Sequence, residues 1–368
     1  MKFKGTKEIV RLLRKDLFEL RQQPKFEWLD KTPDVVRDYA VQTLAKAIKT
    51  SIALMGTGKW TLHYRAKKMM AQETIGVPAR TYGQKRKNSH WGFVKNMRAS
   101  RRDALPSETN AQYQIIRTRF DEYFVVMLEE YHMSQNIPQG GVVSLDPGVR
   151  TFQTCYSADG MVYEWGDGDM KQVFALCRFA DKLHSKWNKE TNKRRRKSQK
   201  LAWLRMLRRI RNRIDECHRK LSTFLCRTFS TILLPKFETS RMVRKLERKI
   251  RRKTARQMCS WSHFRFRERL IAKAELSANA NVIICDEQYT TKTCGKCGCL
   301  HRKIGSNKTF RCPSTTCDHV ADRDVNAARN ILLRYLTVNG VTVNFGDSNG
   351  DVGILCPNRP PRSHNMWR

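Results

Sequence analysis

Hydrophobic and polar residues alternate with different periods along the chain, and the first 130 residues change from a helical to a strand pattern. Apolar residues recur at helical spacing over residues 9–20. A second helix is expected from Pro33 to about Met55, because Thr32 can cap it and proline is favoured at the first helical position. Residues 112–131 are rich in β-branched and aromatic side chains, which predicts paired strands.

A second pattern begins after Gly140-Gly141, where short apolar runs alternate with longer helical segments. Such alternation predicts an α/β layer built on a mixed sheet. The expected elements are strands at 142–145, 151–156 and 161–165, a long amphipathic helix at 201–225, a strand at 231–234, basic helices at about 241–257 and 262–278, and a buried strand at 281–285. Residues 337–368 are rich in glycine, asparagine, proline and arginine, which predicts a disordered basic tail.

The charge balance adds to this picture. The chain has 72 Lys and Arg but only 34 Asp and Glu, which gives a net charge of +38 spread over the whole chain. An extended nucleic acid offers many phosphates to such a surface, whereas a merely basic, ribosome-associated protein is the simpler alternative. No apolar run approaches the roughly 20 residues that span a bilayer, so no membrane partner is expected. The N-terminus lacks the apolar core of a signal peptide, which predicts an intracellular, reducing compartment.

Two basic stretches are candidates for nucleic-acid contact. Residues 56–102 interleave cations with aromatic residues, which suits backbone contact plus base stacking or, alternatively, an ordinary helical face; the aromatic residues are Trp60, Tyr64, Tyr82, Trp91 and Phe93. The long amphipathic helix offers phosphate contacts or a solvated face; the candidates on it are Arg194, Arg195, Arg196, Lys197, Arg205, Arg208 and Arg209. The basic run at 193–197 could also be a nuclear address.

Four of the twelve cysteines have the spacing of a metal site. Cys294 and Cys297 form one pair, and Cys312 and Cys317 form a second, wider pair after a short basic loop. Four thiolates can surround Zn²⁺ tetrahedrally, and a closed site of this kind stabilises the fold. Cys299 and His301 lie close enough in the sequence to be substitute ligands, which stay open as alternatives.

Three acids stand where predicted strands end or a helix begins. Asp146 precedes Pro147-Gly148, Glu287 follows the strand at 281–285, and Asp324 opens an alanine-rich helix. Three converging carboxylates suit Mg²⁺, and two ions roughly 3.5–4 Å apart would support phosphodiester hydrolysis. Singly, each acid is weaker evidence, because Asp146 could be a turn residue and Asp322 could be the helix cap that makes Asp324 look special.

Three motifs in this order resemble the RuvC-like nuclease and zinc-finger core of the TnpB and Fanzor proteins. They are Ser144-Leu145-Asp146-Pro147-Gly148, the run from Tyr289 to Gly298, and the run from Asp322 to Asn330. The resemblance implies a ribonuclease-H-like RuvC domain with an inserted zinc-ribbon module, after an N-terminal helical recognition region and a β-rich wedge. The implied domains are 1–140 for wedge and recognition, 141–288 for the first RuvC part, 289–319 for the zinc finger that binds target nucleic acid, 320–336 for the last RuvC part and 337–368 for the tail.

The resemblance also assigns roles, with one departure. Asp146 is similar to the first catalytic acid of the family and Asp324 to the last. The middle acid of bacterial TnpB proteins follows the strand at 231–234, where this chain has Pro235, which cannot bind a metal. Fanzor-like members carry a relocated glutamate before the zinc finger, where Glu287 stands, and Glu238 is the alternative. Asp286 is expected on the opposite face of its strand.

We therefore expect a transposon-associated, RNA-guided DNA endonuclease that uses two Mg²⁺ ions, one Zn²⁺ site and a structured guide RNA. Its target would be double-stranded DNA with a short flanking motif, and its ribonucleoprotein would contain one copy of the chain. The relocated glutamate and the basic run predict a nuclear location in a eukaryotic or viral setting. The alternatives are a catalytically inactive relative that regulates transposition or transcription, which Pro235 suggests, and an unguided structure-specific nuclease.

Overall fold

The computed structural model divides into two compact units, Met1–Glu130 and Tyr131–Arg368. It describes residues 5–57, 62, 71–82, 106, 108–130, 140–245, 248, 250–277, 279–305 and 307–338. Four of the aromatic residues proposed for base stacking, Trp60, Tyr64, Trp91 and Phe93, lie outside these residues, as does the expected tail from residue 339 onward. No helix of the described part is long and apolar enough to cross a membrane.

The first unit places helices before a small antiparallel sheet; the strands expected within 112–131 are confirmed, whereas the strand at Glu73–Val77 was not predicted. Its elements are α1 (Thr6–Arg21), η1 (Pro24–Leu29), α2 (Asp34–Leu54), η2 (Met55–Thr57), β1 (Glu73–Val77), η3 (Ala79–Thr81), β2 (Tyr113–Arg117) and β3 (Tyr123–Val126), with sheet order β1-β2-β3. The capping prediction is wrong, because Pro33 precedes α2 and the Thr32 hydroxyl instead donates to the Trp28 carbonyl at 3.2 Å. Tyr82 is buried in the core beside Tyr113, so it is not a stacking platform.

The second unit is a five-stranded mixed sheet with helices, which confirms the α/β prediction. Its elements are β4 (Val142–Pro147), β5 (Gln153–Ser157), β6 (Val162–Trp165), α3 (Asp169–Lys189), α4 (Lys193–Thr228), β7 (Thr231–Pro235), α5 (Thr239–Met242), α6 (Arg252–Trp261), α7 (His263–Glu275), β8 (Asn281–Cys285), β9 (Thr309–Arg311), β10 (Val320–Asp322) and α8 (Arg323–Val338). The sheet order is β6-β5-β4-β7-β8, with an antiparallel meander at β4 to β6 and parallel pairs on both sides of β7.

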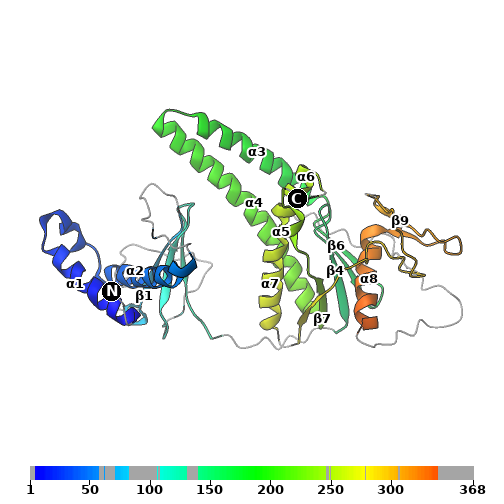
Figure 1. Ribbon diagram of the computed structural model, residues 1–368, viewed down its shortest axis with the longest axis horizontal. Coiled ribbons are helices and arrows are strands. Elements are labelled where there is room, and N and C mark those ends of the chain that lie inside the picture. The colour runs from blue at the N-terminus through cyan, green and yellow to red at the C-terminus, as the bar shows by residue number, and fades with distance from the viewer. Residues whose placement is uncertain are drawn as a thin grey trace. The chain divides into compact units, whose positions relative to one another are not determined.

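Two helical predictions need correction. The single helix expected over about 241–257 is replaced by two shorter helices, α5 and α6. The helix α3 was not predicted; it pairs with α4 in a hairpin that projects beyond the sheet (Figure 1).

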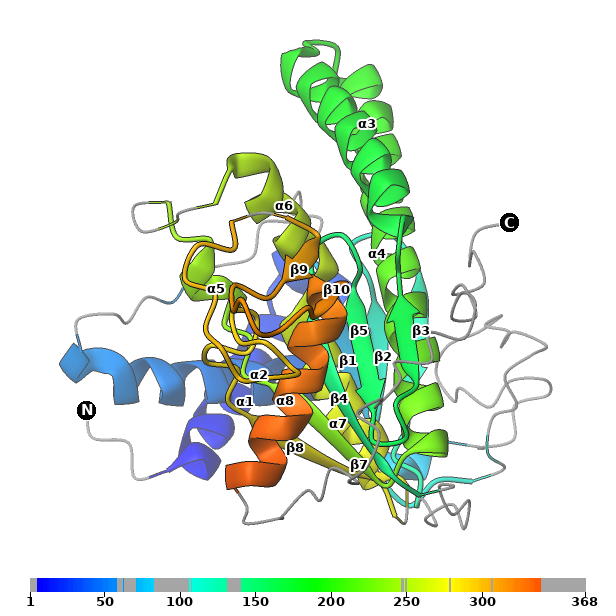
Figure 2. The ribbon, with the colours of Figure 1, turned by 90° about the vertical axis from the view of Figure 1, so that its right-hand side faces the viewer.

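Opposite faces of the sheet carry different helices (Figure 2). On one face, α8 packs through Ala328, Ile331 and Leu332 onto Tyr156 and Leu233. On the other, the main core joins the sheet to α3, α4, α6 and α7. Both faces of β7 are covered, which explains why this strand reads as a continuous apolar run rather than an alternating one.

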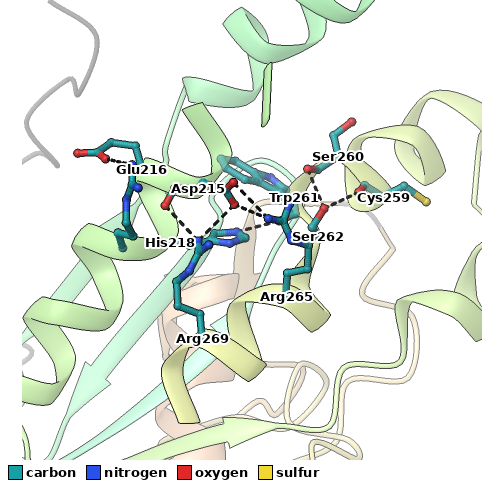
Figure 3. A network of polar contacts seen from close by, with 10 residues as sticks. Asp215, Glu216, His218, Cys259, Ser260, Trp261, Ser262, Arg265 and Arg269 are labelled. Atoms are coloured by element: carbon teal, nitrogen blue, oxygen red, sulfur yellow. Dashed lines mark hydrogen bonds and ion pairs between the residues drawn. The ribbon is translucent and has the colours of Figure 1, made fainter. Parts of the chain in front are cut away.

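A network of polar contacts joins α7 to α4 on the face of the sheet opposite α8 (Figure 3). The Asp215 carboxylate accepts hydrogen bonds from Arg265 at 2.9 Å and from Arg269 at 3.3 Å. His218 of α4 lies 2.9 Å from the Trp261 carbonyl, and burial lowers its pKa to about 4. The neutral imidazole therefore joins the end of α6 to the same scaffold.

Candidate functional site

Asp146 lies at the carboxyl end of β4, on the face of the sheet that α8 covers. Ser144, two residues earlier on the same side, donates its hydroxyl to the Ala328 carbonyl of α8 at 2.7 Å. Asp146 is half-buried, and its strand ends at Pro147, which faces the other side. Asp146 thus stands at the end of a strand, as the sequence predicts, and on the face that carries α8.

Asp324 stands in the first turn of α8, and Asp322 is the residue that caps this helix. The Asp322 carboxylate accepts hydrogen bonds from the backbone N–H groups of Asp324 at 2.9 Å and Val325 at 3.4 Å. The Asp324 carboxylate is therefore not used for capping; it lies 3.2 Å from the Arg323 guanidinium and is 19% exposed. Capping by Asp322 frees Asp324 for a different role.

Glu287 follows β8 by two residues and is half-buried. Cys285, at the end of β8, packs against the α8 side of the sheet. Asp286 between them is exposed and forms an ion pair with Arg334 of α8 at 3.0 Å. The two neighbouring acids thus have separate surroundings, and Glu287 is the one withdrawn from solvent.

The charges of Asp324 and Glu287 act on the Asp146 carboxyl group, and we call these three residues the acid group. Burial raises the pKa of Asp146 well above its usual range, and the negative charges of Asp324 and Glu287 raise it further, while Arg323 opposes them. Burial, followed by the charge of Asp286, raises the pKa of Glu287 as well. Carboxylates that repel one another at the edge of a sheet form a hard-oxygen donor set, which suits a divalent cation.

Pro235 ends β7 between the two acid-bearing strands. Leu233 lies opposite Ser144, and Pro235 lies opposite Cys285. The alternative acid Glu238 is farther along, beside α5, where its carboxylate is 3.4 Å from the Lys236 ammonium. The charge of Glu287 raises the pKa of Asp146, whereas Glu238 pairs with Lys236.

The four predicted cysteines do converge, and we call them the cysteine cluster. Cys294 and Cys317 have their sulfur atoms 4.0 Å apart, and those of Cys297 and Cys312 are 3.5 Å apart. Among the residues that the structure describes, these are the set whose ligand atoms all lie within 4.8 Å of one another, so the acid group is more widely spaced. Four thiol sulfurs at this spacing fit a tetrahedral Zn²⁺ site.

The substitute ligands Cys299 and His301 are not members of the cluster. Cys299 contributes a backbone carbonyl, which accepts from the Cys294 N–H at 2.9 Å. The His301 ring packs near Phe310, with ring centroids 6.0 Å apart. The wider gap of the second pair is accommodated by a turn in which the Cys317 N–H bonds the Ser314 carbonyl.

Two buried asparagines one helical turn apart attach the cysteine cluster to α8. The Asn326 side chain accepts from the Gly295 N–H at 2.9 Å and donates to the Thr293 carbonyl at 2.8 Å. Asn330 donates to the carbonyls of Thr290 at 2.8 Å and Thr293 at 2.7 Å. Sequence reasoning missed this role, although polar residues at i and i+4 of an otherwise apolar helix face were a usable signal.

A fourth acid near the group was also missed. Thr154 lies opposite both Asp146 on β4 and Glu164 on β6, so the three side chains share one face of the sheet. Burial raises the pKa of Glu164, and Lys308 opposes that shift. Lys308 also lies 3.6 Å from the Asp322 carboxylate, which places a cation of the β9 hairpin beside the cap of α8.

The predicted phosphate-binding residues lie on the first half of α4, which projects beside α3 (Figure 1). Asn192 caps this helix by accepting from the N–H groups of Arg194 at 3.0 Å and Arg195 at 3.2 Å. The residues Arg194, Arg195, Arg196, Lys197, Arg205 and Arg209 are exposed, and Arg208 is half-buried. The structure keeps this basic face on the hairpin, separate from the acid group.

Comparisons with known proteins find a matching domain family and several viral relatives. The family described as "Cas12f1-like, TNB domain" matches residues 263–331. Protein A625R of Paramecium bursaria Chlorella virus 1, which carries the name of a transposase, is 31% identical over 233 residues, 62% of this chain and 51% of that protein. The TnpB-like protein L79 of Acanthamoeba polyphaga mimivirus is 29% identical over 198 residues, 51% of this chain and 36% of that protein.

A solved structure of a Cas12f1–sgRNA–target DNA complex contains a chain that aligns with 80% of this one and 71% of its own length, at 14% identity and a TM-score of 0.47. The chain spans about half the length of the chlorovirus relative and about a third of the mimivirus one. The matched domain, residues 263–331, contains Glu287, the cysteine cluster and Asp324. The chain is thus similar to viral proteins named as transposases and as TnpB-like, and its residues 263–331 match the Cas12f1-like TNB domain.

Proposed function

We propose that the protein is an RNA-guided, Mg²⁺-dependent DNA endonuclease whose catalytic acids are Asp146, Glu287 and Asp324. The observation that carries the proposal is the position of these three carboxylates at the ends of β4 and β8 and at the start of α8, where the charges of Asp324 and Glu287 raise the pKa of Asp146. Without a cation, such a group has an unfavourable charge arrangement, which is a property expected of a metal site rather than of a structural element. Its place on a mixed sheet under α8 supports a RuvC-like nuclease domain within residues 141–336.

Each acid would have a distinct task. Asp146 and Asp324 would hold the cations from opposite sides, the first from β4 and the second from the start of α8. Glu287 would complete the set in place of the acid that Pro235 excludes, as in Fanzor-like members. Bound Mg²⁺ would activate a water and stabilise the leaving oxygen of the phosphodiester. Arg323, next to Asp324, limits the negative charge of the group before the ions bind.

The cysteine cluster would be structural. A Zn²⁺ ion held by Cys294, Cys297, Cys312 and Cys317 would fix the loops of the β9–β10 hairpin against α8, where Asn326 and Asn330 already attach them. This position, between β8 and the start of α8, makes the hairpin a neighbour of the acid group. We infer that it is a zinc-ribbon insertion that contacts target nucleic acid.

Charge supports nucleic acid as the partner. A net charge of +38 exceeds what solubility requires and suits contact with many phosphates of a guide RNA and a DNA target. The N-terminal region to residue 140 would serve as wedge and recognition region, and the basic face of α4 would contact phosphates. The protein would act as one copy in its ribonucleoprotein, and the basic run at 193–197 would direct it to a nucleus.

One observation favours a second candidate, a catalytically inactive relative that binds RNA and DNA. Pro235 occupies the strand end where bacterial relatives carry an acid, and the acid group is wider than the cysteine cluster. Such a protein would regulate transposition or transcription. A Glu287→Gln substitution separates the two candidates, because an inactive parent has no nuclease signal to lose.

The experiment that tests the proposal is co-expression of the chain with the DNA that flanks its own gene, followed by purification and sequencing of the bound nucleic acid. The proposal predicts one dominant structured RNA that ends in a variable stretch. Heterogeneous RNA, or none, would contradict guided recognition and favour direct DNA binding. With the RNA in hand, reprogramming its variable stretch should redirect cleavage to a matched duplex.

A further inference from the structure

A hollow lined by basic and aromatic side chains opens at the end of β7. Neither the acid group nor the cysteine cluster contributes to its lining. Its volume is about 800 Å³. It is lined by Lys236, Phe237, Glu238, Thr239, Ser240, Arg241, Arg244, Phe264 and Arg267. We call it the Phe264 hollow, and all of its residues belong to the second unit.

The charge of the hollow selects an anionic ligand. Four of its lining residues are cations, and its one acid, Glu238, lies 3.4 Å from the Lys236 ammonium. Arg241 and Arg244 are exposed on the segment that begins at α5. The hollow therefore has a net positive lining, with two guanidinium groups placed at its surface, and guanidinium groups match the geometry of phosphate oxygens.

An exposed aromatic ring lies among these cations. Phe264, the second residue of α7, is 61% exposed. The Arg267 guanidinium lies over its ring, 4.8 Å from the centroid. Phe237 is anchored at the back of the hollow by edge contact with the buried ring of His263, 4.8 Å away. An exposed aromatic ring with adjacent cations is suited to stacking on a nucleobase.

The backbone places this hollow next to the acid group. β7 runs parallel to both β4 and β8, so its carboxyl end lies between the ends that carry Asp146 and Glu287. The Lys236 N–H bonds the Cys285 carbonyl at 3.1 Å, which holds the start of the hollow against the end of β8. A strand bound in the hollow would thus lie beside the carboxylates rather than on a remote surface.

We propose that the Phe264 hollow binds an unpaired nucleotide of single-stranded DNA that passes to the acid group. The base stacks on Phe264, and the flanking phosphates pair with Arg241 and Arg244. A duplex does not fit this chemistry, because its bases are already stacked and paired and cannot cover an isolated ring. The proposal rests on the proposed function for the identity of the strand, but the binding chemistry itself requires neither a guide nor cleavage.

The test measures binding by the full chain, in an Asp146→Ala background that prevents cutting, to fluorescent oligothymidylate of about 12 nucleotides and to an abasic oligonucleotide of equal length. Phe264→Ala should weaken binding to oligothymidylate by roughly 10-fold and leave binding to the abasic strand unchanged, because the loss concerns stacking alone. Phe264→Trp should retain the affinity. Phe179→Ala is the matched control, since Phe179 is 50% exposed on α3.

The arginines give a complementary readout. Arg241→Gln with Arg244→Gln should weaken binding to both oligonucleotides and make the affinity less dependent on salt, because phosphate contacts release counterions whatever the base. Equal affinity of Phe264→Ala and its parent for oligothymidylate would overturn the proposal. So would an equal loss on the abasic strand, or a larger effect of Phe264→Ala on oligouridylate, which would assign the hollow to RNA.

These outcomes are independent of the proposed function. If Phe264 contributes to binding of bases but no guided cleavage is found, the hollow stands as a single-strand site and the nuclease proposal fails. If guided cleavage is found but the Phe264 substitution leaves binding unchanged, the nuclease proposal stands and the hollow does not. Unchanged thermal unfolding of Phe264→Ala would show that the exposed ring is not needed for folding.

Discussion

Pro235 of β7 lies directly opposite Cys285 of β8, two residues before Glu287. A proline offers no metal ligand at the strand end beside Asp146, while the neighbouring strand delivers a carboxylate whose charge reaches Asp146. Under the proposed function, the acid that one strand lacks would be supplied by the next.

The first prediction concerns which glutamate belongs to that group. Glu287→Gln should lower single-turnover cleavage by at least about 100-fold, because it removes a metal-binding charge and keeps the side-chain shape. Glu238→Gln is the matched control and should cleave within about threefold of the parent, since Glu238 pairs with Lys236 outside the group. The reverse pattern of the two rates would assign the role to Glu238.

The second prediction concerns stability in metal-free protein. The pKa of Asp146 is raised in the folded state, so this carboxyl group stabilises the fold at low pH and that contribution is lost as pH rises through its folded pKa. At neutral pH the ionised group therefore destabilises the fold. Asp146→Asn should raise the free energy of unfolding at about pH 7 by about 1 kcal/mol or more, and the gain should shrink as pH approaches about 4.

Thermal unfolding of the parent and of Asp146→Asn, with Mg²⁺ withheld, measures this difference. Added Mg²⁺ should raise the melting temperature of the parent more than that of the variant, because binding to the folded state stabilises it. A variant less stable than its parent at neutral pH would show that Asp146 is a structural residue.

The third prediction concerns the cysteine cluster. Purified protein should contain about one zinc per chain, and Cys312→Ser should lose it together with the ordered hairpin. Elemental analysis and limited proteolysis of residues 289–319 measure the two effects. Cys299→Ser is the control and should keep the metal, since Cys299 is not in the cluster. Zinc loss from Cys299→Ser would mean that the ligand set is different.

The fourth prediction concerns the attachment of the hairpin to α8. Asn326→Ala should reduce the free energy of unfolding by about 1–3 kcal/mol, because it leaves the buried Gly295 N–H and Thr293 carbonyl with fewer partners. Urea unfolding measures this loss, and Asn188→Ala, on the exposed side of α3, should change stability by less than about 0.5 kcal/mol. Equal stability of both variants would contradict an anchoring role for Asn326.

Much of the second unit was predictable because its signals are local. The three-stranded meander follows from apolar runs separated by turn residues, and the cysteine cluster follows from spacing. The helix α3 was missed because it begins after Gly166-Asp167-Gly168, a segment typical of a loop, although Met170, Val173 and Cys177 have helical spacing.

The missed site residues depend on tertiary contacts instead. Asn326 and Asn330 form hydrogen bonds with backbone groups more than 30 positions earlier in the chain. Glu164 lies on the same face as Asp146 because β5 pairs with both of their strands. Thr32 was misjudged for a related reason, since the turn before α2 offers its hydroxyl the Trp28 carbonyl. Periodicity specifies the face on which a residue lies, whereas its partner is set by the packing of other elements.

The central claim is that Asp146 is a metal-binding catalytic acid of a guided nuclease, and the most direct measurement is cleavage of a matched duplex by the purified ribonucleoprotein in Mg²⁺. The parent should cut the matched target and leave a mismatched one intact, while Asp146→Ala should bind the matched target with unchanged affinity and fail to cut it. Undiminished cutting by Asp146→Ala would contradict the claim.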